Sequence, residues 1–170
     1  IVALEGGEGK ASPIAQLVRF DGKNLEGKSK QALRTAKVLG KSGLRLGGKD
    51  IDRWISNHLL PEENPTNSIL RMAEDLKCEL SNMNIKETSV ITKQVKNNQN
   101  EEKFLKLSKK GLEDLLIEKG LLKSIEKLLN QTITIAKRNS FELKDLDSVV
   151  LVGGGSRIPL IKNHLSNICN

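Results

Sequence analysis

Residues 148–159 read Ser-Val-Val-Leu-Val-Gly-Gly-Gly-Ser-Arg-Ile-Pro, and the organisation of the chain follows from this segment. Its apolar run is rich in β-branched residues and predicts a strand that is buried on both faces. Three glycines follow, and Ser156 is then a candidate cap for a helix whose first turn accommodates Pro159. This order brings bare backbone N–H groups up to a phosphate or a nucleoside, so it suggests a nucleotide site. The glycine triplet alone is equally consistent with a tight strand-to-helix connection.

The composition is that of a globular protein. The chain has 170 residues, 37% hydrophobic and 29% charged, which allows a sizeable core in one domain or two small lobes. No apolar run approaches the roughly 20 residues that span a bilayer, and no signal peptide is recognisable. Because the sequence opens on Ile1 and lacks an initial Met, we interpret it as a fragment that begins inside a strand. Cys78 and Cys169 lie far apart in the chain, which suits a reducing, cytoplasmic location and predicts no disulfide.

The charge pattern leaves two interpretations open. The net charge is +7, and much of it falls within residues 28–45. Such a segment can attract phosphate polymers, but three Phe, one Trp and no Tyr offer few platforms for stacking bases. A solvated basic face is therefore favoured over a nucleic-acid or anionic-surface binder. His58 and His164 are single histidines on helical patterns, which favours ordinary imidazoles and predicts no metal site.

Hydrophobic periodicity predicts an alternation of strands and helices. Strands are expected at residues 1–4, 13–20, 88–93, 102–107 and 149–152, and helices from the glycine turn at 46–50 to Pro61, at 65–82, at 109–138 and after Ser156. Residues 30–39 could form a strand or a helix, and their position after a hairpin signal favours a strand. Asp21-Gly22 predicts the turn of a hairpin between the second and third strands. Gly120 is expected to break the long third helix, whose predicted apolar stripe includes Leu122 and Ile133.

A polar stripe accompanies the apolar stripe of the helix at 65–82. Glu74, Lys77 and Ser81 recur at i, i+3 and i+7, away from the apolar positions. The spacing alone favours a solvated helix flank.

Three segments together resemble the DnaK-like, seventy-kilodalton heat-shock chaperone ATPases. Residues 143–159 resemble the adenosine-binding end of that family. Residues 46–52, Leu-Gly-Gly-Lys-Asp-Ile-Asp, resemble its Leu-Gly-Gly turn before a helix. Residues 74–81, Glu-Asp-Leu-Lys-Cys-Glu-Leu-Ser, resemble the helix whose Glu, Lys and Ser contact adenosine. The motifs follow the family's order, and the resemblance covers about residues 31–170.

The resemblance implies an α/β fold, namely the second lobe of an actin-like (ribonuclease H-like) ATPase with an inserted α+β subdomain. Residues 1–59 with 132–170 would form the base, and residues 60–131 the upper subdomain. The adenine and ribose of a nucleotide would lie between them.

The resemblance also implies roles for particular residues. The implied nucleotide-binding residues are Gly6, Gly7, Glu74, Lys77, Ser81, Gly153, Gly154, Gly155 and Arg157. Glu74 would accept ribose hydroxyls, Lys77 would donate a hydrogen bond near the ribose, and Ser81 would bond the adenine edge. The glycines would let the nucleotide approach the backbone, and Arg157 would lie along the adenine face. No catalytic residue is assigned.

One segment departs from the family pattern. The family's second phosphate loop reads Asp, any residue, Gly, Gly, Gly, Thr, whereas residues 4–9 read Leu-Glu-Gly-Gly-Glu-Gly. When the paired glycines are aligned, Leu4 replaces the acid and Gly9 the threonine. Glu8 adds a negative charge whose repulsion of a phosphate is on the order of a few kcal/mol in a partly screened site.

The leading interpretation is therefore the adenine-nucleotide-binding lobe of a DnaK-like chaperone ATPase, a half-site that requires a first lobe. The resemblance implies ATP or ADP with Mg²⁺ as ligands, and client or co-chaperone proteins as further partners. This chain alone is not expected to hydrolyse ATP. The alternatives are a degenerate ATPase fold that serves as an interaction or regulatory module, and a basic binder of anionic surfaces or nucleic acid.

Overall fold

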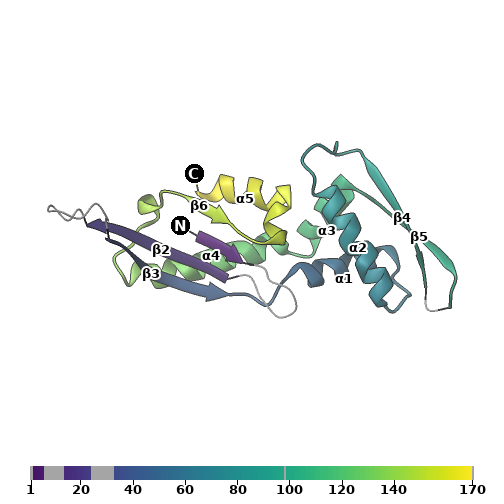
Figure 1. The fold of residues 1–170 in the computed structure, drawn as a ribbon, viewed down its shortest axis with the longest axis horizontal. Coiled ribbons are helices and arrows are strands. Elements are labelled where there is room, and N and C mark those ends of the chain that lie inside the picture. The colour runs from purple at the N-terminus through teal and green to yellow at the C-terminus, as the bar shows by residue number, and fades with distance from the viewer. Residues whose placement is uncertain (1, 6–13, 24–32, 98, 170) are drawn as a thin grey trace.

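The computed structural model describes residues 2–5, 14–23, 33–97 and 99–169, which form a mixed α/β structure (Figure 1). Its strands are β1 (Val2–Glu5), β2 (Ile14–Lys23), β3 (Leu33–Gly43), β4 (Val90–Lys96), β5 (Glu102–Ser108) and β6 (Val149–Leu151). Its α-helices are α1 (Gly48–Leu59), α2 (Asn67–Leu80), α3 (Lys109–Glu118), α4 (Leu121–Lys137) and α5 (Pro159–Cys169). Two 3-10 helices, η1 (Leu143–Asp145) and η2 (Gly154–Arg157), flank β6. The order of elements is the one that the sequence predicts.

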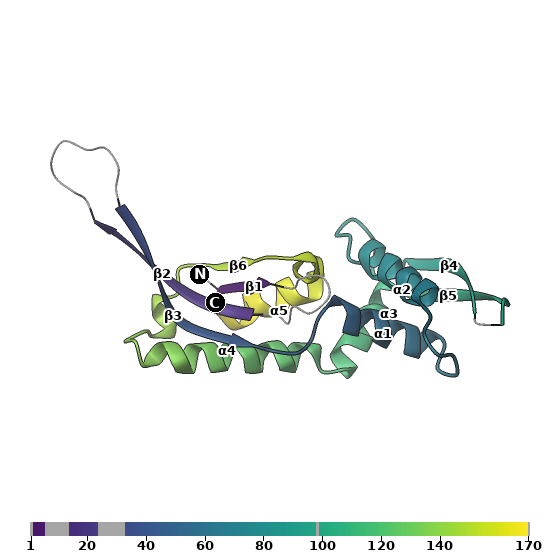
Figure 2. The ribbon, with the colours of Figure 1, turned by 60° about the horizontal axis from the view of Figure 1, so that its bottom comes forward.

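A four-stranded sheet forms one end of the molecule, with the strand order β3-β2-β1-β6 (Figure 1). β1 runs antiparallel to β2 and parallel to β6, and β2 runs antiparallel to β3. α4 packs along β3 and β2, and Figure 2 shows it running the length of this sheet. Pairing with β1 therefore fixes the position of β6 in the sheet, and the glycine turn begins where β6 ends.

The predicted hairpin is confirmed as the β2–β3 pair, but the predicted position of its turn is wrong. Asp21 pairs with Thr35 and Gly22 pairs with Arg34, so both residues lie inside the ladder. An Asp-Gly pair favours a tight turn locally, yet continued pairing satisfies more backbone groups than an early turn would. The connection between the strands falls within residues 24–32, outside the described residues.

β6 is an edge strand, so the prediction that it is buried on both faces is wrong. Its neighbour among the described strands is β1. Val149 and Leu151 pack against the core, whereas Val150 between them is 42% exposed. Successive side chains of a strand point to opposite faces, and the core covers one of them. A continuous apolar run in the sequence does not show which of its residues are exposed to solvent.

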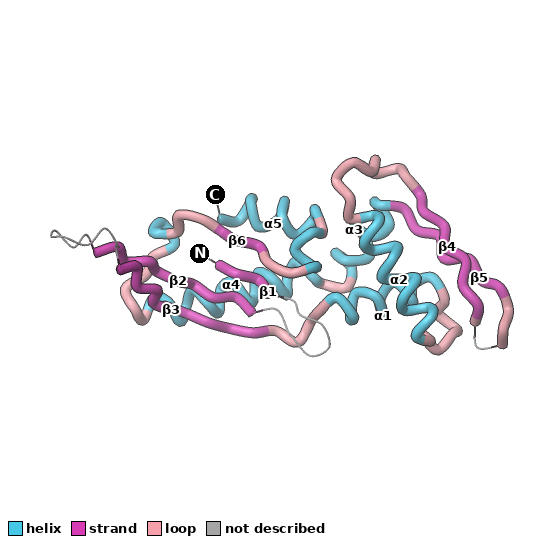
Figure 3. The backbone as a smooth tube through the Cα atoms, in the orientation of Figure 1, coloured by secondary structure: helices cyan, strands magenta, loops and turns pink. Residues whose placement is uncertain are grey.

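The second sheet is the antiparallel pair β4–β5 at the opposite end of the molecule (Figure 3). Val95, Leu105 and Leu107 are buried on its inner face, and Phe104 on its outer face is 62% exposed. α2 packs against both strands. α1 packs on α2 and also contacts α3 and β5. Figure 3 shows α1, α2 and α3 as a group of helices between the two sheets.

The predicted break at Gly120 is confirmed, because α3 ends at Glu118 and α4 begins at Leu121. Gly120 lies between them with φ 74°, a left-handed conformation that glycine adopts without a Cβ penalty. The buried residues of α4 are Leu121, Ile125, Leu128, Leu129, Thr132 and Ala136. Leu122 and Ile133 of the predicted stripe are only half-buried. The break restarts the helical phase, so the stripe of α3 does not continue into α4.

α4 and β3 approach each other closely at Gly40. A Cβ built on Gly40 would lie well inside van der Waals distance of the Thr132 carbonyl oxygen and 3.1 Å from the Ala136 nitrogen. Next along the strand, Ser42 Oγ donates to the Leu128 carbonyl at 2.9 Å. The missing side chain at Gly40 therefore lets the helix lie directly on the strand.

The structure also bears on the thiols, the basic segment and the membrane. Cys78 on α2 and Cys169 on α5 are free, so the predicted absence of a bridge between them is confirmed. The basic segment is exposed at each of its charged residues whose side chains are described, namely Lys37, Lys41 and Arg45. Within the described ranges, every helix is too short or too polar to cross a membrane.

Candidate functional site

A pocket of about 430 Å³ lies where the start of α1, one face of α2 and the turn after β6 meet. The sequence-predicted residues that line it are Glu74, Lys77, Ser81, Gly154, Gly155 and Arg157. Gly153 immediately precedes η2, which carries the lining glycines. Gly6 and Gly7 fall outside the described residues. The structure thus brings together the α2 stripe and the glycine turn, which are far apart in the sequence.

α2 presents the polar stripe to this pocket because its opposite face is committed to the core. Ile69, Ala73 and Leu76 are fully buried. The helix begins after Thr66, whose hydroxyl accepts a hydrogen bond from the Ile69 N–H at 3.1 Å and caps the first turn. Lys77 and Ser81 are each only 9% exposed. The prediction of a solvated helix flank is therefore wrong for these two residues, because α1 packs against this side of α2.

Lys77 makes a buried ion pair across to α1. Its Nζ donates to Asp52 Oδ1 at 2.6 Å and more weakly to the Gly48 carbonyl oxygen at 3.4 Å. Both charged side chains are nearly covered, with 11% of the Lys77 side chain and 7% of the Asp52 side chain exposed. An ammonium has three donors, so one N–H remains beyond these two acceptors. The Lys77 charge is thus partly balanced within the protein before any ligand arrives.

Burial raises the pKa of the Asp52 carboxyl above its ordinary value. The hydrogen bond and the positive charge from Lys77 oppose this shift but do not cancel it, and the charges of Glu74 and Asp50 add to it. Loss of hydration therefore raises the pKa of Asp52 by more than Lys77 lowers it.

Glu74 and Ser81 flank Lys77 on α2 and offer acceptors. Glu74 is exposed, and within the described part of the chain its carboxylate has no ion pair. Ser81 Oγ donates its hydrogen to the Lys77 carbonyl at 2.7 Å. The Ser81 oxygen keeps its lone pairs, so it can accept a hydrogen bond but has no proton left to donate. The pocket therefore presents a free carboxylate and an acceptor hydroxyl on either side of an ammonium.

The glycine turn is built differently from the predicted cap. Gly153 has φ 91° and ψ 169°, a conformation that is essentially restricted to glycine. Ser156 lies inside η2, and its hydroxyl donates back to the Gly153 carbonyl at 2.6 Å. α5 begins only at Pro159, so the prediction that Ser156 caps this helix is wrong. The prediction that the first turn of the helix accommodates Pro159 is confirmed, because Pro159 needs no N–H partner there.

Gly154 and Gly155 leave open space in the pocket. A Cβ built on either residue would meet nothing within 4 Å. Neither glycine is therefore required by the packing of the described protein around it. Both line the pocket, so the room that a side chain would occupy is available to a ligand that approaches the backbone.

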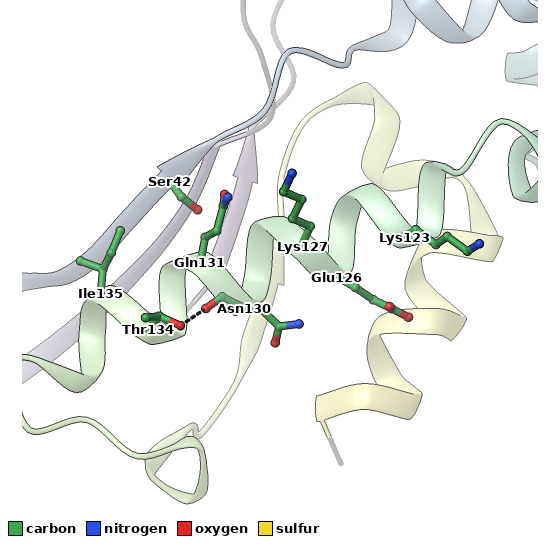
Figure 4. Close-up of a pocket in the computed structure, with 8 residues that line it drawn as sticks. All are labelled: Ser42, Lys123, Glu126, Lys127, Asn130, Gln131, Thr134 and Ile135. Carbon is green, nitrogen blue, oxygen red and sulfur yellow. Dashed lines mark hydrogen bonds between the residues drawn. The ribbon is translucent and has the colours of Figure 1, made fainter.

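A second hollow, of about 670 Å³, lies along α4 beside Ser42. Figure 4 shows Ser42 on β3 and the other side chains spread along α4, in contrast to the α1–α2 pocket, where three segments meet. Its polar groups are partly engaged already. Thr134 Oγ1 donates to the Asn130 carbonyl at 2.7 Å, and Glu126 Oε1 lies 2.9 Å from His164 Nε2 on α5. The α1–α2 pocket is therefore the better candidate for a functional site.

Sequence reasoning missed Asp52 and Cys78, which also line the pocket. Asp52 belongs to the quoted Leu-Gly-Gly segment, but no spacing rule links a residue of α1 to Lys77 on α2. Cys78 follows Lys77 directly, and burial raises the pKa of its thiol. Among the residues that the structure describes, no cluster of three or more His, Cys, Asp or Glu side chains could hold a metal ion.

Comparison with known proteins supports a family. A family model described as Hsp70 protein matches residues 37–170. This range includes every described residue named above for the pocket, whereas residues 4–9 lie outside it. No curated protein matches the chain.

Proposed function

This chain belongs to the Hsp70 family, and from that premise we propose that it is an adenine-nucleotide-binding lobe of a chaperone ATPase. The proposal rests chiefly on one observation. The pocket is lined jointly by the start of α1, the polar stripe of α2 and the glycine turn after β6. These are the three segments that the resemblance assigns to the adenosine end of the nucleotide.

The chemistry of the α2 stripe suits a nucleoside. Glu74 offers a free carboxylate, which we assign to the hydroxyl groups of ribose. Lys77 offers its remaining N–H to the same part of the ligand. Ser81 offers an acceptor, which matches an amino group on the edge of adenine. We assign Arg157, which is exposed at the end of η2, to the face of the adenine ring.

The glycine turn supplies the close approach. The space beside Gly154 and Gly155 would admit the ligand to within contact of the backbone. Gly153 holds the strained conformation that turns the chain out of β6. We assign all three glycines to nucleotide binding on this basis.

The phosphate end is a separate proposal. We assign Gly6 and Gly7 to it from the resemblance alone, because they lie outside the described residues. We also propose that a first lobe completes the site, and that hydrolysis with Mg²⁺ requires groups from both lobes. The described part of this chain holds the nucleoside and leaves the reacting phosphate to those groups.

The division into subdomains remains a prediction. We propose a base at residues 1–59 and 132–170 and an upper subdomain at residues 60–131, as the resemblance implies. α1 ends at the first boundary and packs on α2 and α3, and α4 runs continuously through the second boundary and packs along β3 and β2, so both helices would couple the two parts. A cytoplasmic location and contacts with client or co-chaperone proteins are further proposals that rest on the family.

Calorimetric titration of the 170-residue chain with adenosine, ADP and ATP tests the proposed function. A site that contacts one side of the ligand is expected to bind with micromolar or weaker affinity, about −8 kcal/mol or less favourable. Inosine, which lacks the exocyclic amino group of adenosine, serves as the control nucleoside and should bind more weakly. A chain that shows no heat with any adenine ligand at millimolar concentration would refute the proposal.

The three adenine ligands are expected to bind with affinities within about tenfold of one another, a spread of about 1.4 kcal/mol. The pocket residues are all assigned to the nucleoside end, and the resemblance implies that Glu8, outside the described residues, would repel added phosphates. The titrations should be run with and without magnesium. This outcome favours the alternative of a degenerate fold that senses nucleotide without hydrolysis. ATP that binds a hundredfold more tightly than adenosine would show that residues 4–9 still hold phosphate, and would exclude that alternative.

Replacing Gly155 by alanine is expected to weaken adenosine binding several-fold and leave stability unchanged. The new Cβ would meet no protein atom and would project into the space proposed for the ligand. The free energy of unfolding should stay within about 0.5 kcal/mol of the wild-type value. Gly120→Ala is the matched control, because its φ of 74° predicts a loss of about 1 kcal/mol of stability with unchanged binding. Unchanged adenosine affinity in Gly155→Ala would show that the glycine turn does not contact the ligand.

A further inference from the structure

The contact between Asp52 and Lys77 joins two of the three walls of the pocket. Asp52 lies in the second turn of α1, and Lys77 lies in the last turn of α2. Their 2.6 Å ion pair is nearly buried, and the Lys77 ammonium also reaches the Gly48 carbonyl at the start of α1. A Cβ on Gly48 would stand 3.4 Å from Lys77 Nζ, which is an ordinary contact distance and shows how close the ammonium lies to the first turn of α1. Two contacts therefore hold the Lys77 ammonium against α1, one with Asp52 and one with the Gly48 carbonyl.

The position of Lys77 has a consequence for Glu74. The two residues are three positions apart on α2, a spacing at which a glutamate and a lysine commonly pair with each other. Lys77 instead pairs with Asp52, and Glu74 has no ion pair among the described residues. Asp52 therefore draws the ammonium toward α1 and leaves the Glu74 carboxylate available to the pocket.

A buried ion pair is weak evidence for stability, because taking two charges out of water can cost more than their attraction returns. Burial keeps the pKa of Asp52 raised in spite of Lys77, which means that the charged carboxylate is less favourable here than in water. The charge is therefore better explained by what it does to Lys77 than by what it contributes to folding.

We propose that Asp52 is a positioning residue of the nucleoside pocket, which holds the Lys77 ammonium against α1 and so keeps Glu74 free for ligand hydroxyl groups. This inference rests on the proposed function. In the absence of the Asp52 charge, Lys77 is released to pair with Glu74, and the donor and acceptor that the ribose needs neutralise each other.

Asp52→Asn tests the inference in the 170-residue chain, because it removes the charge and keeps the shape and a carbonyl acceptor. We expect calorimetry to show adenosine binding weakened about tenfold, which is about 1.4 kcal/mol. Binding of adenine, which lacks the ribose, should stay within about twofold of the wild-type value, or about 0.4 kcal/mol. Asp114→Asn is the matched control, since Asp114 is an exposed carboxylate on α3 and does not line the pocket. It should leave both affinities unchanged.

A double-mutant cycle separates positioning from a merely structural role. If Asp52 acts through Lys77, Asp52→Asn should have little further effect on adenosine affinity in a Lys77→Ala background. Additive effects, or equal losses for adenine and adenosine, would overturn the inference. Normal adenosine binding by Asp52→Asn would overturn it and leave the proposed function intact. A wild-type chain that binds no adenosine would instead refute the proposed function.

Urea unfolding across pH supplies a check that the variant folds. The raised pKa means that folded Asp52 keeps its proton to a higher pH than the unfolded chain does. Its contribution to stability is therefore greatest below about pH 4 and falls as the pH rises through the raised value. Lys77, Glu74 and Asp50 are the charges that act on it, and they are the same in both proteins. The stability of Asp52→Asn relative to the wild type should thus rise as the pH passes from about 4 through the raised pKa of Asp52, and should stay constant above it. A marked loss at neutral pH would show that the pair serves folding and would overturn the inference.

Discussion

Lys77→Ala is expected to weaken adenosine binding by roughly tenfold to a hundredfold. The ammonium is fixed by Asp52 and Gly48, so its remaining N–H is already oriented when the ligand arrives. A hydrogen bond from a charged donor is worth about 1.5–3 kcal/mol, which corresponds to this range of affinities. The loss should be much smaller for adenine than for adenosine, because Lys77 is assigned to the ribose. Calorimetric titration with both ligands measures the difference.

Two further variants make this result interpretable. Lys49→Ala removes another lysine that lines the same pocket, but Lys49 is exposed on α1 and has no ion pair within the described residues. An exposed charge of this kind is expected to contribute less than about 1 kcal/mol. Lys77→Met preserves most of the buried volume and shows whether the loss reflects the charge or the packing. If Lys77→Ala binds adenosine as tightly as the wild type does, the polar stripe of α2 does not contact the nucleoside and this part of the proposal is wrong.

Gly40→Ala is expected to cause the largest loss of stability. The added Cβ would press on the backbone of α4, at the Thr132 carbonyl and the Ala136 nitrogen. Helix backbone cannot move aside as a flexible side chain can, so either α4 or β3 must shift. Such overpacking lowers the free energy of unfolding by about 1–3 kcal/mol, and the Ser42–Leu128 hydrogen bond beside it would add to the loss if the helix moves. Urea denaturation measures this change.

Gly154→Ala provides the control for Gly40→Ala. It makes the same chemical change at a residue where a Cβ meets nothing within 4 Å, and its unfolding midpoint should match the wild type. If Gly40→Ala also unfolds at the wild-type midpoint, the close approach of α4 to β3 is not rigid. If both variants lose stability equally, the loss does not come from the contact between β3 and α4, because Gly154 makes no such contact.

Local sequence signals predicted the elements of this fold well. The break at Gly120, the hairpin of β2 and β3 and the start of α1 after Gly47 each depend on a few neighbouring residues. Glycine conformation, strand alternation and helical spacing act over a few positions, so they can be interpreted without knowing the rest of the structure. The same is true of Glu74, Lys77 and Ser81, whose spacing already places them together on one side of α2.

Other features depended on contacts that no local pattern encodes. Val150 is exposed because β6 lies at the edge of its sheet. The pairing of Lys77 with Asp52 across two helices arose only when α1 packed on α2.

The amino-acid pattern was therefore sufficient to predict which segments are helices and strands and which side chains are candidates for a nucleoside site. The tertiary structure alone decided that Lys77 is buried, that its partner is Asp52 and that Glu74 is left free. The physical reason is one of range. Backbone preferences act between neighbours in the chain, whereas burial and the choice of an ion-pair partner depend on which surfaces meet after folding.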